Sequence, residues 1–152
     1  MLLKEINEML EKEISKAILD LKIKDKVKVF TGDEKNSILS KLQKIFVIGN
    51  PRVWWLSLKY KPISYVFEQK EPYKKIADFF DKEEEVWFVV EDEFNNNDQL
   101  LYKMKIAYVI DIIGECMGFE YNVISEDYNR FLCETDHDEF LFIDINKNQL
   151  KE

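Results

Sequence analysis

The amino-acid sequence predicts an α+β domain with a single mixed or mostly antiparallel sheet of about five to seven strands, and with helices mainly on one side of that sheet. Residues 86–90 are five consecutive β-branched or aromatic residues between two acidic stretches, which is typical of a strand buried on both faces near the middle of a sheet. Residues 2–21 repeat apolar side chains at three- and four-residue steps, which indicates a helix. Residues 119–124 alternate apolar and polar side chains, as a strand with one wet face does.

Length and composition favour one domain over residues 1–152, because 46% of the residues are hydrophobic and can form a sizeable core. The two cysteines, Cys116 and Cys133, lie in apolar stretches without metal-binding spacing, so we expect two buried free thiols and a cytoplasmic location. The N-terminus lacks the pattern of a signal peptide, and no apolar run approaches the roughly 20 residues of a membrane span. We therefore expect no membrane association, no cofactor and no metal.

The first half of the chain is predicted to contain two helices and three short strands. The predicted elements are a helix over residues 3–21, a strand over 27–30, a helix capped by Asp33 and broken at Gly49, and strands over 53–58 and 63–68. Trp54 and Trp55 are neighbours in one predicted strand, so one of them should be partly exposed. The short connection around Pro62 favours a hairpin of these two strands.

The second half is predicted to combine two helices with further strands around the buried one at 86–90. Pro72 should start a short helix, and the next helix should span about residues 100–117 and close at Gly118. The segment 63–90 permits either a parallel crossover or a split antiparallel arrangement. Strands at 119–124, 130–134 and 140–145 should form a meander.

Acidic residues are concentrated in the second half of the chain. The formal net charge is −8, and residues 81–152 hold nineteen acidic against six basic residues. This distribution argues against a nucleic-acid binder, which needs a basic surface to neutralise phosphates. It suits a basic protein partner, although a solvated acidic surface would give the same pattern.

Standard catalytic and nucleotide-binding motifs are missing, and the chain has a single histidine. Asp111 and Glu115 form an i, i+4 acidic pair, which indicates either an acid or metal-ligand pair or a wet helix face. His137 lies in an acidic loop and could act as a base or simply be hydrogen-bonded there. These residues leave two functions open besides the binding of a protein partner. One is a small hydrolase-like enzyme that uses Glu115, Cys133, Glu134 and His137, and the other is a ligand- or metal-binding regulatory domain.

The C-terminal third carries a familiar order of residues. A helix ends in Gly-Glu-Cys at 114–116, a Glu-Tyr strand follows at 120–121, and Leu-Cys-Glu at 132–134 precedes His137-Asp138. With Trp54-Trp55 and the strand at 86–92, the order resembles a small family of uncharacterised bacterial proteins, over about residues 53–144. Members of that family often have the sequence His-His-Asp where this chain has Asp136-His137-Asp138. The resemblance therefore does not imply a function that needs two imidazoles in this chain.

The resemblance supplies no established activity. In size, acidity and α+β layout the chain is similar to immunity proteins of polymorphic bacterial toxin systems, including the SUKH-like group. We therefore expect a non-enzymatic protein-binding module that neutralises a basic toxin domain. Acidic residues at strand ends and an exposed tryptophan should form its surface. The residues expected to bind the partner are Glu91, Asp92, Glu93, Asp136, Asp138, Trp54 and Trp55.

Overall fold

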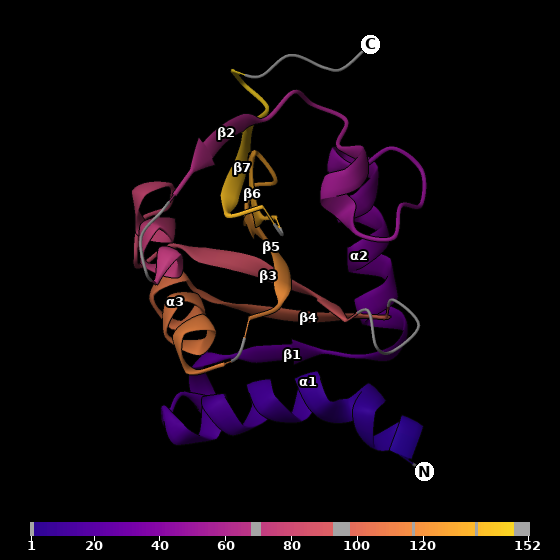
Figure 1. Cartoon of the computed structure of the whole chain (residues 1–152), viewed down its shortest axis with the longest axis vertical. Helices are drawn as coiled ribbons and strands as arrows, with labels where there is room; N and C mark the ends of the chain where they lie inside the picture. Colours follow the sequence, from indigo (N-terminus) through magenta and orange to yellow (C-terminus); the bar gives the residue numbers. More distant parts are fainter. Residues whose placement is uncertain (1, 68–70, 93–97, 117, 136, 148–152) are drawn as a thin grey trace.

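Seven antiparallel strands form one sheet in the computed structural model, which describes residues 2–67, 71–92, 98–116, 118–135 and 137–147, with side chains from residue 9 onward. The strand order is β1-β4-β3-β5-β6-β7-β2 (Figure 1). The predicted α+β class and sheet are confirmed. The strands are β1 (Lys28–Phe30), β2 (Ile63–Val66), β3 (Glu85–Asp92), β4 (Asp98–Lys105), β5 (Glu120–Ser125), β6 (Arg130–Glu134) and β7 (Glu139–Asp144).

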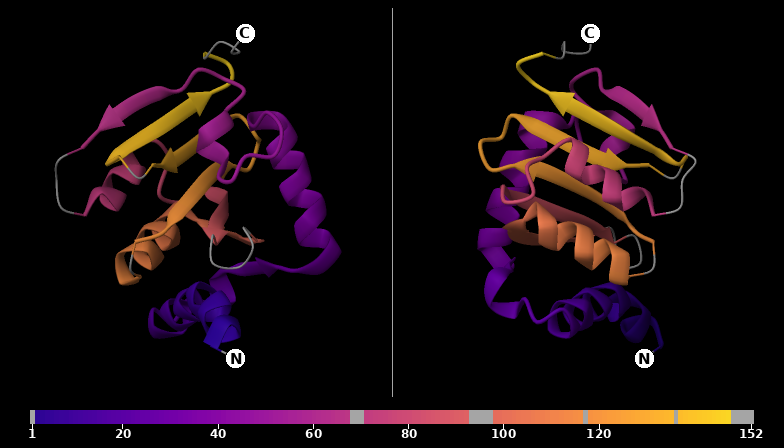
Figure 2. Two further views of the ribbon diagram at one scale, coloured as in Figure 1. Left: turned by 45° about the vertical axis from the view of Figure 1, so that its right-hand side comes forward. Right: turned by 90° about the vertical axis from the view of Figure 1, so that its left-hand side faces the viewer.

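Helical segments cover both faces of the sheet, and most of their residues lie on one of them (Figure 2). The helices α1, α3 and η3 contribute to one core cluster, whereas α2 and η2 contribute to the other. Each cluster buries the apolar side of its helices against the sheet, which is the main source of stability in such a layered domain. The helical segments are α1 (Leu2–Asp20), α2 (Gly32–Phe46), α3 (Ile106–Glu115) and the 3₁₀ segments η1 (Lys24–Lys26), η2 (Trp54–Ser57) and η3 (Pro72–Asp78).

Strand β3 lies inside the sheet between β4 and β5 and is buried on both faces, as predicted. Val86, Phe88 and Val90 belong to the core under α1 and α3, while Trp87 and Val89 belong to the core under α2. The neighbouring strand β5 is also buried on both faces, so its expected wet face is wrong. Asn122 of β5 is a polar residue with an exposed fraction of only 1%, because helices cover both sides of the strand.

The segment after α2 differs from the prediction, because residues 54–57 form the 3₁₀ segment η2 and not a strand. Its backbone is tied to the end of α2, where the Ile48 amide donates to the Ser57 carbonyl at 2.8 Å and the Lys59 amide donates to the Phe46 carbonyl at 2.7 Å. The predicted hairpin is also wrong. Strand β2 pairs with β7, so it lies at the sheet edge.

Two further boundaries differ from the prediction. Residues 98–105 form β4 and only residues 106–115 are helical, because β4 pairs with both β1 and β3 and its apolar residues contribute to both cores. Thr31, and not Asp33, is the N-cap of α2, and no side-chain cap bond forms there. The segment that begins at Pro72 is the predicted short helix in 3₁₀ form. No parallel crossover forms, because β2 and β3 are separated by three strands of the antiparallel sheet.

The remaining predicted elements are confirmed. Strands β5, β6 and β7 form the expected antiparallel meander. The first helix is α1, where Ile14, Ala17 and Ile18 are buried, and β1 follows it. Because β3 and β6 run in the same direction, the meander places the end of β3 and the β6–β7 turn at the same end of the sheet.

Candidate protein-binding surface at the acidic end of the sheet

Acidic residues collect at the end of the sheet where β3 and β6 finish and where β4, β5 and β7 begin. Each of these strands places an Asp or Glu there because its terminal residue or the adjoining turn is acidic. The register supports the grouping, since Glu91 lies opposite Glu120 and Asp92 lies opposite Asp98. We call this set the acidic end. Its described members are Glu91, Asp92, Asp98, Glu120, Glu134, Asp138 and Glu139.

Uncharged donors hold several of these carboxylates. The Trp54 backbone amide donates to Glu91 at 2.9 Å, and the side-chain amide of Gln99 donates to the same carboxylate. The Tyr121 hydroxyl donates to Glu134 at 2.7 Å. The Ser64 hydroxyl donates to Glu139 at 2.5 Å. Such bonds satisfy the oxygen atoms but leave the negative charge in place.

Two cations act on carboxylates of the acidic end. Lys35 approaches Asp98 at 3.3 Å, and Arg52 lies close enough to Glu91 to favour its ionised form. Glu120 acts in the opposite sense on Glu91 because the two are like charges. Glu134 and Glu139, by comparison, accept their hydrogen bonds from hydroxyl groups.

At the opposite end of the sheet, three acidic residues are paired with Lys or Arg, whereas Asp127 accepts hydrogen bonds from the Ser125 hydroxyl and the Asn129 amide. Glu83 contacts Lys105 at 2.7 Å, and Glu126 contacts Lys103 at 2.5 Å. Glu84 forms an ion pair with Arg130. The two ends of the sheet therefore differ in how some of their carboxylates are held, with more Lys and Arg ion pairs at the opposite end.

Burial changes the titration of two carboxyl groups at the acidic end. Burial raises the pKa of Glu91 above its ordinary value, and the bonds from Gln99 and Trp54 oppose this effect. Burial also raises the pKa of Glu134, with a further contribution from Asp138, whereas the bond from Tyr121 lowers it. Desolvation therefore outweighs hydrogen bonding at both carboxyl groups.

The structure brings the predicted acidic groups to a common end of the sheet but does not expose all of them. The side chains of Glu91 and Asp92 are only 8% and 2% exposed, so the expected solvent-facing collar after β3 is wrong at these positions. Glu91 is held there by Trp54 of η2 and by Gln99 of β4. Asp138 is exposed, whereas Glu93 and Asp136 lie outside the described residues.

The two adjacent tryptophans have different environments, as expected, although they lie in a 3₁₀ segment. Trp54 is 3% exposed and belongs to the core beneath α2, while Trp55 is half-buried. Trp55 lies edge-on to His137 with ring centroids 6.1 Å apart. Trp55 can therefore contribute to a surface beside the acidic end, whereas Trp54 supports that surface from inside.

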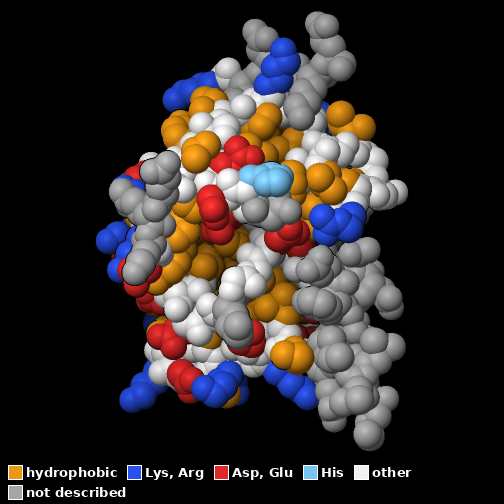
Figure 3. Space-filling view, in the orientation of Figure 1, with side chains coloured by type: hydrophobic (Ala, Val, Ile, Leu, Met, Phe, Trp, Pro, Cys, Tyr) orange, Lys and Arg blue, Asp and Glu red, His pale blue; other side chains and the backbone are white. Residues whose placement is uncertain are grey.

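The surface around the histidine is visible in the space-filling view. In Figure 3 the single imidazole lies among acidic side chains, with hydrophobic side chains nearby. The described residues here include Asp138 and Glu139 next to His137, and Thr135, whose hydroxyl accepts a hydrogen bond from the His137 amide at 3.2 Å. A negative rim with apolar side chains beside it is typical of a surface that binds proteins.

Of the residues in the enzyme alternative, Glu134 and His137 both lie at the acidic end, whereas Cys133 and Glu115 do not. Cys133 is fully buried in the core under α2, and burial holds the pKa of its thiol far above the ordinary value. Glu115 is the exposed last residue of α3, which covers the other face of the sheet. Asp111 is also exposed, so the acidic pair lies on the wet side of that helix.

The described part of the chain meets the requirements of neither a metal site nor a membrane span. No three His, Cys, Asp or Glu side chains lie in an arrangement that could hold a metal ion. No described helix has the length and hydrophobicity needed to cross a membrane.

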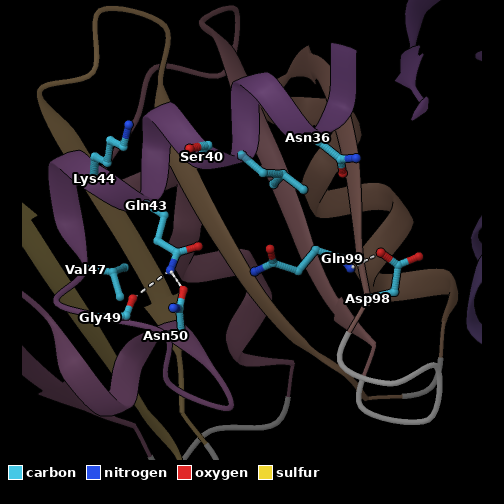
Figure 4. A pocket seen from close by; sticks show the side chains of 10 residues that line it. Asn36, Ser40, Gln43, Lys44, Val47, Gly49, Asn50, Asp98 and Gln99 are labelled. Atoms are coloured by element: carbon cyan, nitrogen blue, oxygen red, sulfur yellow. Dashed lines mark hydrogen bonds between the residues drawn. The ribbon is translucent and has the colours of Figure 1, made fainter. Parts of the chain in front are cut away.

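A polar cavity of about 420 Å³ lies beside the acidic end, between α2 and the start of β4 (Figure 4). Gln43 fixes one wall, because its amide donates to the Gly49 carbonyl at 2.7 Å and to the Asn50 side chain at 2.9 Å. Gln99 forms part of the other side and connects the cavity to buried Glu91. Sequence reasoning missed this cavity, because its amide residues are far apart in the chain and follow no motif.

The comparisons with known proteins define a family but no activity. No curated protein and no solved structure matches the chain. The matching family model covers residues 7–152, so it includes most of α1, which the sequence resemblance over about residues 53–144 left out. On this match the chain belongs to the family of unknown function DUF6756.

Proposed function

We propose that this chain is a non-enzymatic protein-binding module that docks a basic partner onto the acidic end of the sheet. One observation carries the proposal. Carboxylates of the acidic end, such as Glu134 and Glu139, are bonded by hydroxyl groups, whereas Glu83 and Glu84 at the other end are paired with Lys105 and Arg130. Negative charge that the protein does not neutralise is available to a partner.

The physical role of such a surface is to guide association. Opposite charges attract over about a Debye length, roughly 8 Å at physiological salt, and complementary potentials raise the association rate more than the final affinity. Trp55, half-buried beside His137, would supply the aromatic contact that often anchors such an interface.

For the identity of the partner we propose a bacterial toxin domain with a basic surface, so that the chain acts as an immunity protein. The support is the acidic, compact α+β layout, which is similar to that of immunity proteins. The separation of Cys133 and Glu115 on opposite faces of the sheet also favours binding over catalysis. An inhibitor of this kind needs a stable scaffold and a complementary surface, and no catalytic group.

The test is to measure binding of the toxin domain encoded by the gene next to the one for this chain. Association and dissociation rates are measured at low and high salt for the wild type and for a double variant with Glu120→Lys and Asp138→Asn. Asparagine suits position 138 because the backbone there has φ +55°. We expect several-fold slower association for the variant, and a wild-type association rate that falls with salt.

A matched control carries the same change in charge away from the acidic end. Glu85 and Asp25 are both exposed, so Glu85→Lys with Asp25→Asn alters the net charge equally. If this control slows association as much as the first variant, long-range charge acts without a defined docking surface. If neither variant changes the rate, the acidic end is only a solvated surface. Absence of a toxin gene beside this one would contradict the immunity role.

A further inference from the structure

Strand β2 is an exposed edge of the sheet with an apolar sequence. All four of its residues are exposed, and Ile63, Tyr65 and Val66 are 49%, 44% and 73% exposed. Figures 1 and 2 show β2 as the outermost strand beyond β7. Proteins usually protect such an edge with charged residues, bulges or a covering segment. The four residues of β2 carry no charge.

The backbone of β2 presents hydrogen-bonding groups to this open side. The Phe67 amide donates to the Asp138 carbonyl at 3.1 Å, and the register pairs Tyr65 with Phe140 and Ile63 with Phe142. Since inward and outward groups alternate along an antiparallel strand, the amides and carbonyls of Ser64 and Val66 point away from β7.

We propose that this edge binds β2 of a second copy of the chain, in antiparallel orientation about a two-fold axis at Tyr65. In this register Ser64 of one copy faces Val66 of the other. The outward amide and carbonyl of each residue then find a partner, which gives four hydrogen bonds and leaves no outward group of either residue unpaired. Tyr65 lies opposite its own copy, and Ile63 lies opposite Phe67.

Local charge supports a second copy as the occupant. The cavity of about 640 Å³ beside Tyr65 is lined by apolar and aromatic residues together with Lys75 and Asp78. A two-fold axis through Tyr65 places this lining next to its own copy, so Lys75 of one chain can approach Asp78 of the other. Two molecules with a net charge of −8 repel one another at their acidic ends, but the β2 edge combines apolar residues with one charge of each sign.

The pairing is distinct from the proposed function and does not depend on it. An axis perpendicular to the sheet reverses the strand direction, so the acidic ends of the two copies point to opposite ends of a continuous sheet. Both acidic ends remain open, which predicts two partner-binding surfaces per dimer. A junction of short strands is smaller than a standard interface of about 1,600 Å², so we expect a dissociation constant in the micromolar range.

Sedimentation velocity over a range of protein concentrations tests the association. We expect the wild type to shift from monomer to dimer across the micromolar range. Ser64→Pro removes an outward amide without removing a bond to β7, so it should weaken the dimer at least tenfold. The matched control, Ser64→Ala, keeps that amide and loses only the hydroxyl that donates to Glu139, so it should still dimerise.

Cross-linking tests the register. In Tyr65→Cys the two new thiols lie opposite one another at a non-hydrogen-bonded pair, where Cβ atoms are about 4.5–5.5 Å apart, so mild oxidation should give a covalent dimer. Val66→Cys is the control, because position 66 faces position 64 and not itself. The wild type, which has free cysteines at 116 and 133, gives the background.

Three results would overturn the proposal. The first is a wild type that stays monomeric at the highest concentration reached. The second is a dimer that persists in folded Ser64→Pro protein, which would place the interface elsewhere, including the other edge strand, β1. The third is equal cross-linking of the Tyr65→Cys and Val66→Cys variants. Circular dichroism of each variant shows whether the fold is retained.

Discussion

The backbone amide of Trp54 donates a 2.9 Å hydrogen bond to the carboxylate of Glu91, across 37 positions of the chain. This bond ties η2 to the end of β3, and both side chains are buried. The same carboxylate accepts a bond from Gln99 of β4. Glu91 therefore joins three segments beneath the acidic end, which makes it a structural residue of that surface.

Glu91→Gln should reduce the dependence of stability on pH. Burial raises the pKa of Glu91 in the folded state, so the folded protein holds this proton more tightly than the unfolded chain does. The resulting stabilisation is complete below the unfolded pKa and is lost as the pH rises through the folded pKa. Urea unfolding at a series of pH values should show a smaller loss of stability with rising pH in Glu91→Gln.

The control for this experiment is Glu85→Gln, at the exposed start of the same strand. It removes one negative charge from the same strand without changing a buried carboxyl group, so it shows the effect of net charge alone. If Glu91→Gln follows the wild-type profile across the pH range above the ordinary Glu value, Glu91 does not titrate as its burial requires.

The sequence predicted those helices and strands whose pattern of apolar residues is contained in one short stretch of the chain. The run of residues 86–90 predicted a buried strand because five apolar residues between acidic stretches fit few other structures, and β3 confirms it. Residues 100–105 were assigned to a helix because they continue into the apolar stripe of α3. Pairing of β4 with β1 and β3 decides their conformation, and such long-range contacts do not appear in a local pattern.

At the candidate site, too, local patterns were predictable from the sequence and long-range contacts were not. Glu91, Asp92 and Asp138 lie at the same end of the sheet because strand directions alternate from β3 to β7. The burial of Glu91 could not be predicted, since it involves η2, which lies 37 positions away in the sequence. The hydrogen bond from Ser64 to Glu139 could not be predicted either, because β2 was expected to pair with residues 53–58 and not with β7.

Phe88→Ala should destabilise the protein by about 3–5 kcal/mol, the usual cost of truncating a buried phenylalanine. Phe88 is fully buried and contacts the rings of Tyr102, Phe119 and Tyr121. Urea unfolding gives the change in free energy. Leu19→Ala is the control, because Leu19 is 60% exposed and its truncation should change stability by less than about 0.5 kcal/mol. Similar losses for both variants would contradict the placement of the core.

The two cysteines should react slowly and at different rates with a thiol reagent. Burial raises the pKa of Cys116 to about 12, with further contributions from Glu13 and Glu115, so little thiolate is present near neutral pH. Cys133 is fully buried and should react only after unfolding. A two-phase reaction is expected, and Cys116→Ser should remove its faster phase. Rapid reaction of both thiols in the native protein would show that the core opens readily.

His137→Ala should leave folding intact and change partner association by no more than a few-fold. The side chain is exposed, and the ring contact with Trp55 at 6.1 Å is at the rim of the structure. The nucleophile that the enzyme alternative would require, Cys133, is buried in the core under α2, so a histidine at the surface has no evident chemical role.

Three measurements on His137→Ala separate binding from catalysis: the unfolding free energy, the partner association rate and protection against the toxin in cells. We expect all three to stay close to wild type, because the imidazole is exposed and meets Trp55 only edge-on, with ring centroids 6.1 Å apart. Trp55→Ala is the comparison, because losing a half-buried aromatic side chain should weaken partner binding. If His137→Ala keeps its fold and its association rate but loses protection, the imidazole takes part in chemistry, and the enzyme alternative replaces the binding proposal.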